Sequence, residues 1–352
     1  MADPTIQTFC CHSGNGSYMA TNVMNEFNSD AYNAVCLFSS ILGILGSIYQ
    51  ILPREQYANN HRWLSFSAAR GRKIIVCLAI SDLMASLGIF LRSSLWLNYK
   101  NIMPAVDDEA SVWFCAVSSA WTQYFYTATW IWTLCYAIDM RLILADKESH
   151  TKIYHLVAWT VPAILTTIGL SLLYFPNANC HNPIDLTDKI IRILPNYIAT
   201  YIPIAIVMIA NPWLYMSSCK DMERYITCSY SQFTSRERDI IDAIKVKFLV
   251  INLVFYICWI PNLINGLLLW ILWFNLPIQF IVTVWYIMAF TNPLQALFNC
   301  LVYRRWNKGS ERLILPWRKS ESKEKILIPS EERYPLLHPT PRNSINGYKT
   351  YN

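Results

Sequence analysis

The sequence predicts an all-α membrane protein, a bundle of seven transmembrane helices with its N-terminus on the lumenal or extracellular side. Hydrophobic residues make up 54% of the 352 residues and charged residues only 15%, whereas soluble proteins carry about 25% charged residues. Asp, Glu, Lys and Arg are also absent over runs of roughly 18 residues or more, which suffice to cross the hydrocarbon core as a helix. The chain is therefore expected to fold in lipid.

Seven apolar segments cover most of the chain and leave no room for a soluble domain between them. They are residues 31–52, 74–97, 112–138, 153–174, 193–216, 248–274 and 278–303. The last two share one run without charges that is too long for a single crossing at about 1.5 Å per residue, and Pro277 marks the hairpin because it cannot continue the preceding helix. The sequence thus divides into an N-terminal segment (1–30), a seven-helix domain (31–303) and a tail (304–352).

The distribution of Lys and Arg orients the bundle, because loops that face the cytosol are enriched in both. The loops after the first, third and fifth spans carry fourteen, and the opposite loops carry three, Lys100, Lys189 and Arg192. The N-terminus is therefore expected outside, where Asn15 lies in a glycosylation sequon, and the tail in the cytosol. The net charge of +6 reflects these loops, so a lipid bilayer is expected as partner and a nucleic acid is not.

Neither a metal centre nor an enzyme is predicted. The eleven cysteines form no C-x-x-C pair and lie mostly in apolar segments, which disfavours zinc. A membrane-embedded metal hydrolase would need several histidines, and His155 is the only one in any span. An opsin or retinal-binding pump would need a lysine in the last span, which has none. The first thirty residues show no signal peptide, so the first span is expected to direct insertion.

Two ionisable side chains stand clearly inside a span, Asp82 and Arg92. Such groups are costly in lipid unless they face the bundle interior or water, which makes each a functional candidate. Arg92 lies near the outer end, and two interpretations stay open: its guanidinium reaches the lipid headgroups, or it pairs with a ligand carboxylate. Asp82 lies deeper, and Asn292 in the last span is its expected partner, in a polar site able to hold water or a sodium ion.

Two further patterns indicate a switch and a ligand site. A proline within a span removes a backbone hydrogen bond and opens a kink; Pro261 follows Trp259 closely, and Pro293 follows Asn292, so we predict hinges there. The third span is rich in aromatic residues, most of which are expected to pack or to lie at the interface. Three that fall on one side near its outer half are the predicted ligand contacts: Trp121, Tyr124 and Phe125.

Taken together, these motifs resemble the G-protein-coupled receptor superfamily. The resemblance is carried by LAISDL at residues 78–83, Trp159, CWIP at 258–261 and the Asn292-Pro293 pair. It implies a disulfide between Cys115 and Cys180. Because Cys10 and Cys11 also face outward, three pairings of the four outward cysteines stay open.

A closer resemblance is to the ocular albinism type 1 receptor family of pigment-cell organelles. It is carried by TFCC at residues 8–11, LRSSLWL at 91–97, LCYAID at 134–139, YHLVAW at 154–159, YFP at 174–176 and ANP at 210–212. It implies a diverged, non-mammalian receptor of melanosomes, late endosomes or lysosomes that also reaches the plasma membrane. Such a receptor responds to L-DOPA or a related catechol, signals through heterotrimeric G proteins and arrestin, and regulates the biogenesis of these organelles.

Three departures from common rhodopsin-like receptors stand out. At the inner end of the third span, Asp139-Met140-Arg141 displaces the usual arginine by one position, about 100° around the helix, so the usual ionic latch is not expected. Thr122 stands where amine receptors hold an aspartate, which disfavours a monoamine ligand. The last span lacks the tyrosine expected after its proline. Its residues 292–303 resemble those of slime-mould cyclic AMP receptors as much as those of rhodopsin-like receptors.

The mechanism that follows is a ligand-driven shift between two conformations. A small aromatic ligand contacts Arg92 and the three aromatic residues of the third span, while Trp259 and Pro261 act as hinge. The inner ends of the helices meet the G protein through Asp139, Arg141, Lys245 and Lys247. The alternative function is a seven-span transporter or channel for small solutes, although no internal repeat between the halves is visible.

The tail contributes two expectations. The sequence ERYPLL at residues 332–337 resembles an acidic dileucine sorting signal, in which Glu332, Leu336 and Leu337 dock on a clathrin adaptor. Residues 303–306 and 313–315 are expected to form a short amphipathic helix on the inner leaflet.

Overall fold

The computed structural model describes residues 27–56, 62–99, 109–144, 150–174, 186–228, 235–271, 278–306 and 311–313. All of them belong to the first of two compact units, residues 1–314, and the second unit comprises residues 315–352. Several predicted sites lie outside the described residues: Cys10, Cys11, Asn15, Cys180, Glu332, Leu336, Leu337 and the side chain of Lys247.

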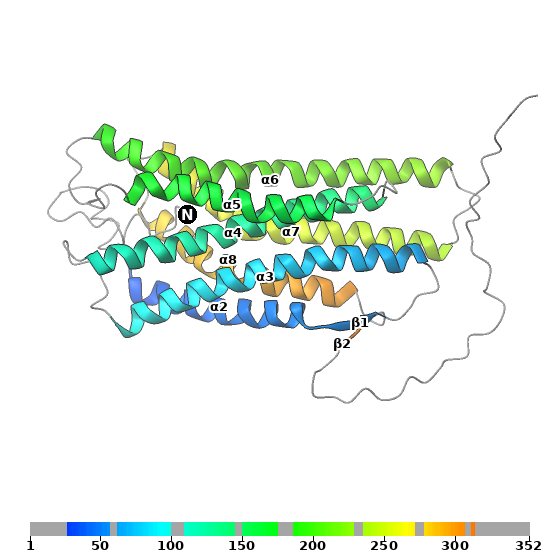
Figure 1. The fold of residues 1–352 in the computed structure, drawn as a ribbon, viewed down its shortest axis with the longest axis horizontal. Helices are drawn as coiled ribbons and strands as arrows, with labels where there is room; N and C mark the ends of the chain where they lie inside the picture. The colour runs from blue at the N-terminus through cyan, green and yellow to red at the C-terminus, as the bar shows by residue number, and fades with distance from the viewer. Residues whose placement is uncertain are drawn as a thin grey trace, which may run out of the picture. The chain divides into compact units, whose positions relative to one another are not determined.

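Seven helices within the described residues confirm the predicted seven-helix bundle. They are α2 (Ser29–Ile51), α3 (Arg62–Asn98), α4 (Glu109–Leu144), α5 (Thr151–Tyr174), α6 (Leu186–Cys228), α7 (Ser235–Ile271) and α8 (Ile278–Trp306). They run alongside one another, as Figure 1 shows. Each predicted span falls on one helix and ends within three residues of it or inside it. We call the end of the bundle at which α4 ends, next to Arg141, the inner end, and the opposite end the outer end.

Six of these helices are long and apolar enough to cross a membrane, and α4 is the exception. Many of its side chains carry a hydroxyl group or an aromatic ring. It packs on α3, α5 and α6, and Thr127, Thr129 and Trp132 on it are fully buried. Because other helices cover so much of α4, it does not need an apolar surface.

Two glycines of α2 lie directly against the backbone of α8. A Cβ added at Gly43 would lie 2.3 Å from the carbonyl oxygen of Pro293, and one added at Gly46 would lie 2.7 Å from the Cα of Leu297. Between the same helices, the Ser39 hydroxyl donates to the Ala289 carbonyl oxygen at 2.7 Å. In a regular helix the Ala289 carbonyl would accept from the N–H of residue 293, but Pro293 has none. The Ser39 hydroxyl of α2 therefore supplies the hydrogen-bond donor that α8 lacks at its proline.

Two short strands, β1 (Arg54–Gln56) and β2 (Glu311–Leu313), pair antiparallel with Arg54 opposite Leu313. The predicted amphipathic helix was therefore wrong: α8 continues to Trp306, and the next described segment is a strand. The amphipathic pattern was local, whereas β2 owes its conformation to hydrogen bonds with the loop between α2 and α3, far away in the sequence.

Candidate functional site

Asp82 lies buried in α3 and is held by two neighbours. Its carboxylate accepts hydrogen bonds from the Thr129 hydroxyl at 2.9 Å and from the Asn299 amide at 3.5 Å. The predicted partner, Asn292, was wrong. Asn292 and Asn299 share a face of α8 but are separated by seven residues, about 10 Å along the axis. The sequence placed the partner on the correct face but could not fix the axial register of α3 against α8.

Trp259 lies at the centre of the bundle, with no exposed surface. Its ring meets Tyr126 and Trp130 of α4 edge to face, with centroids 5.0 and 4.9 Å apart. Its indole N–H donates to the Gln295 side-chain oxygen of α8 at 2.6 Å. One side chain of α7 thus joins three helices, two residues before the kink at Pro261, where a hinge was predicted.

Three buried polar atoms around Trp259 have no hydrogen-bond partner within the described part of the chain. They are the Trp130 indole N–H and the side-chain oxygens of Asn262 and Asn292. Trp130 contacts the Trp259 ring, Asn262 lies one turn along α7 from Trp259, and Asn292 lies one turn from Gln295 on α8. We call these residues, together with Trp259, Tyr126 and Gln295, the Trp259 centre. It offers one donor and two acceptors to a neutral hydrogen-bonding group.

A second polar layer connects α6, α7 and α8 with α4. The Gln123 amide donates to the Thr200 hydroxyl at 3.3 Å, and the Trp285 indole N–H donates to the Asn265 oxygen at 2.9 Å. The Asn265 amide in turn reaches the Tyr201 hydroxyl at 3.5 Å. Sequence reasoning missed these residues because uncharged amides hardly disturb an apolar span. The three-residue spacing of Asn262 and Asn265 was the available signal, since it places both on one face of α7.

The predicted ligand contacts on α4 lie elsewhere, on the seam with α3 and α5. Trp121 is 38% exposed, and its indole N–H donates to the Met84 carbonyl of α3 at 2.8 Å. The Tyr124 hydroxyl donates to the Trp159 carbonyl of α5 at 3.2 Å, and the Phe125 ring packs against both aromatic neighbours. The Trp121 and Tyr124 side chains therefore connect α4 to α3 and α5. The structure does not place them at the Trp259 centre.

Arg92 is buried, with only 5% of its side-chain surface exposed. The interpretation in which it extends into the lipid headgroups was therefore wrong, because a snorkelling guanidinium would be exposed. A role in pairing with a ligand carboxylate stays a prediction.

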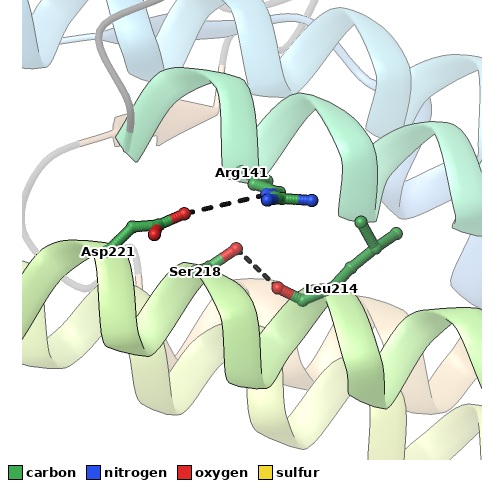
Figure 2. A network of polar contacts seen from close by, with 4 residues as sticks. All are labelled: Arg141, Leu214, Ser218 and Asp221. Carbon is green, nitrogen blue, oxygen red and sulfur yellow. Dashed lines mark hydrogen bonds and ion pairs between the residues drawn. The ribbon is translucent and has the colours of Figure 1, made fainter.

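At the inner end, Arg141 contacts α6. Its Nε lies 3.8 Å from the Asp221 carboxylate, and its guanidinium lies 5.3 Å from the centroid of the Trp213 ring. Figure 2 shows the pair, with Ser218 donating to the Leu214 carbonyl of its own helix. Both charged side chains are more than a third exposed, so water screens the pair and it contributes at most about 1 kcal/mol.

The residues predicted to face a G protein do not all do so. Asp139 has no exposed surface, so in this conformation it cannot contact a partner. Asp139 and Arg141 are two positions apart, about 200° around α4, which is why one points into the bundle and the other toward α6. Lys245 is half-buried near the inner end of α7.

Cys115 at the outer end of α4 forms a disulfide. Six other cysteines of the described residues form no disulfide: Cys36, Cys77, Cys135, Cys219, Cys258 and Cys300. The pairing of Cys115 with Cys180 stays a prediction.

Comparison with known proteins agrees with this architecture. The family model of the ocular albinism type 1 protein matches residues 1–333. Human G-protein coupled receptor 143 is 30% identical over 97% of this chain and 85% of its own length. Cyclic AMP receptor 4 of Dictyostelium discoideum is 25% identical over 28% of this chain and 22% of its own length. Squid rhodopsin, 14% identical, shares the fold with a TM-score of 0.56 over 84% of this chain and 89% of that one. The chain, a multi-pass membrane protein, therefore belongs to the ocular albinism type 1 protein family.

Proposed function

We propose that the chain is a G-protein-coupled receptor whose ligand acts on the Trp259 centre. The observation that carries the proposal is Trp259 itself, a fully buried side chain that joins α4, α7 and α8 beside three polar atoms that have no partner among the described residues. A ligand that bonds these atoms better in one conformation shifts the equilibrium toward it by that difference. The name of the human relative, G-protein coupled receptor 143, supports the same class of function.

The proposed ligand is L-DOPA or a related tyrosine-derived catechol. Each phenolic hydroxyl both donates and accepts hydrogen bonds, so a catechol can accept from the Trp130 N–H and donate to the Asn262 oxygen. The buried Arg92 would pair with the carboxylate of an amino-acid ligand. Thr122 is buried where a carboxylate would be needed for a monoamine, which argues against ligands that carry only an amine.

Signalling to a heterotrimeric G protein, and binding of arrestin, would take place at the inner end. The fourteen Lys and Arg that lie between the predicted spans at this end support a cytosolic placement. Of the residues predicted to meet the partner, Arg141 and Lys245 have described side chains, and Lys247 is proposed to join them. The hard oxygens of Asp82 and Thr129, which lie 2.9 Å apart, are suited to a sodium ion that responds to the conformational change.

The proposed location is the membrane of melanosomes, late endosomes or lysosomes. Its support is the sequence of the tail, where Glu332, Leu336 and Leu337 match an acidic dileucine signal for a clathrin adaptor, and the membership of the chain in its family.

The proposal is tested with the purified chain in lipid nanodiscs together with a purified G protein. L-DOPA is expected to accelerate nucleotide exchange. Asn262→Leu, which keeps the branched shape of the side chain but removes its polar atoms, should raise the half-maximal concentration about tenfold, the equivalent of one lost hydrogen bond. Trp121→Phe is the matched control, because it removes an indole N–H that bonds the Met84 carbonyl of α3, away from the Trp259 centre. It should leave the half-maximal concentration of L-DOPA within about twofold of wild type.

The alternative, a transporter, is measured in the same preparation. Reconstituted liposomes are expected not to accumulate radiolabelled L-DOPA. Uptake into these liposomes, with nucleotide exchange unaffected by L-DOPA, would contradict the receptor and favour a carrier.

A further inference from the structure

The seam between α6 and α7 contains a hydrogen bond that crosses from one helix to the other. The Tyr256 hydroxyl donates to the main-chain carbonyl of Met208. In an uninterrupted helix that carbonyl would accept from the N–H of residue 212. Residue 212 is a proline and has no N–H. Tyr256 of α7 thus supplies the donor that α6 lacks, as Ser39 of α2 does for α8.

One turn nearer the inner end, the same seam contains two buried carboxamides, Asn211 of α6 and Asn252 of α7. They lie at one level, because the Tyr256–Met208 hydrogen bond precedes them and the Tyr215–Phe248 ring contact, 5.4 Å between centroids, follows them. Asn211 is 0% and Asn252 6% exposed. Within the described residues neither side chain has a hydrogen-bond partner at its oxygen or its nitrogen.

These two sets of groups favour different conformations. A buried amide without a partner destabilises the conformation that contains it, and two carboxamides can exchange N–H to oxygen hydrogen bonds with each other. Tyr256 and Asn252 are four residues apart and share a face of α7. A movement of α7 that brings Asn252 onto Asn211 therefore also moves the Tyr256 hydroxyl relative to Met208.

We infer that Tyr256 is a positioning residue that holds α7 on α6 in the resting conformation, and that Asn211 and Asn252 bond each other in the signalling conformation. The assignment of these two conformations to rest and signalling rests on the proposed function. The inference that the seam has two arrangements is independent of the proposed function.

The first test measures the position of α7 without a G protein. Nitroxide labels are placed at Lys73→Cys on α3 and Val246→Cys on α7, both exposed near the inner end, with other accessible thiols replaced by serine. Tyr256→Phe removes only the hydroxyl and should raise the population of a second distance at least threefold. Tyr286→Phe is the matched control, because its hydroxyl donates to the Asn28 carbonyl at the outer end, and it should not change the distances.

The second test separates a switch from a structural role. Asn252→Leu removes an unsatisfied amide from the resting conformation, so the melting temperature of the chain in nanodiscs should rise, and the second distance of Tyr256→Phe should disappear when the two changes are combined. An unchanged distance distribution in Tyr256→Phe, or a lower melting temperature in Asn252→Leu, would overturn the inference. If the distances shift as expected but nucleotide exchange does not follow, the seam is a switch and the proposed G-protein function fails instead.

Discussion

Replacing Gly43 by alanine is expected to separate α8 from α2 and to destabilise the whole bundle. The added Cβ would lie 2.3 Å from the carbonyl oxygen of Pro293 and 2.8 Å from the Ser86 hydroxyl. The first of these atoms is backbone, so it can give way only if α8 moves, and that movement would break the hydrogen bond from Ser39 to Ala289. We expect a loss of about 3 kcal/mol, at the upper end for overpacked cores, and a melting temperature lower by roughly 6–12 °C.

Gly71→Ala is the control for this substitution, because the same methyl group meets a neighbour that can move. The nearest atom to its added Cβ is the terminal carbon of Met140, a flexible side chain, at 3.3 Å. The melting temperature should change by less than about 2 °C, since alanine also favours the helix more than glycine does. Equal losses in the two variants would show that the close contact of α2 and α8 does not limit stability.

Removing the Trp259 side chain is expected to have the second large effect, on both stability and signalling. Trp259→Ala deletes the contacts with Tyr126 and Trp130 and leaves the Gln295 oxygen buried without a donor. Truncation of a buried tryptophan costs about 3–5 kcal/mol, and an unsatisfied acceptor adds about 1–3 kcal/mol. Since this variant can fail to fold, the milder Trp259→Phe keeps a six-membered ring in place and removes the N–H donor together with the rest of the indole.

A second substitution separates the loss of the hydrogen bond from the cost of leaving its acceptor buried without a donor. Trp259→Phe should lower ligand-evoked nucleotide exchange at least tenfold and reduce the free energy of unfolding by about 2 kcal/mol. Adding Gln295→Leu removes the orphaned oxygen, so the double variant should regain part of that stability while its exchange stays low. Wild-type exchange by Trp259→Phe would show that the indole N–H takes no part in the response.

The spans were predictable from the sequence because lipid makes apolar length a direct signal. Each helix must satisfy its own backbone groups in the membrane, so a charge-free run of sufficient length becomes a helix whatever surrounds it. Trp259 was predictable for a related reason, since the proline two residues on marks a point where the helix hydrogen bonds are interrupted.

Contacts between helices were harder to predict, because periodicity gives the face of a residue and not its level. Asp82 shows this directly. The partner was predicted on the face of α8 that Asn292 and Asn299 share, and the axial register of α3 against α8 brings Asn299 to the carboxylate. On α4 the aromatic residues form two faces. One, with Trp121, packs on neighbouring helices, and the other, with Tyr126 and Trp130, faces Trp259. Composition alone did not distinguish them.

The most direct test of the receptor account is the side of the membrane on which each end of the chain lies. Epitope tags at Met1 and Asn352 are followed in sealed vesicles that expose their cytosolic face to protease. An odd number of crossings, with positive loops in the cytosol, predicts that the tag at Asn352 is digested at once and the tag at Met1 only after detergent is added. Digestion of both tags in sealed vesicles, or protection of both, would contradict a seven-span receptor.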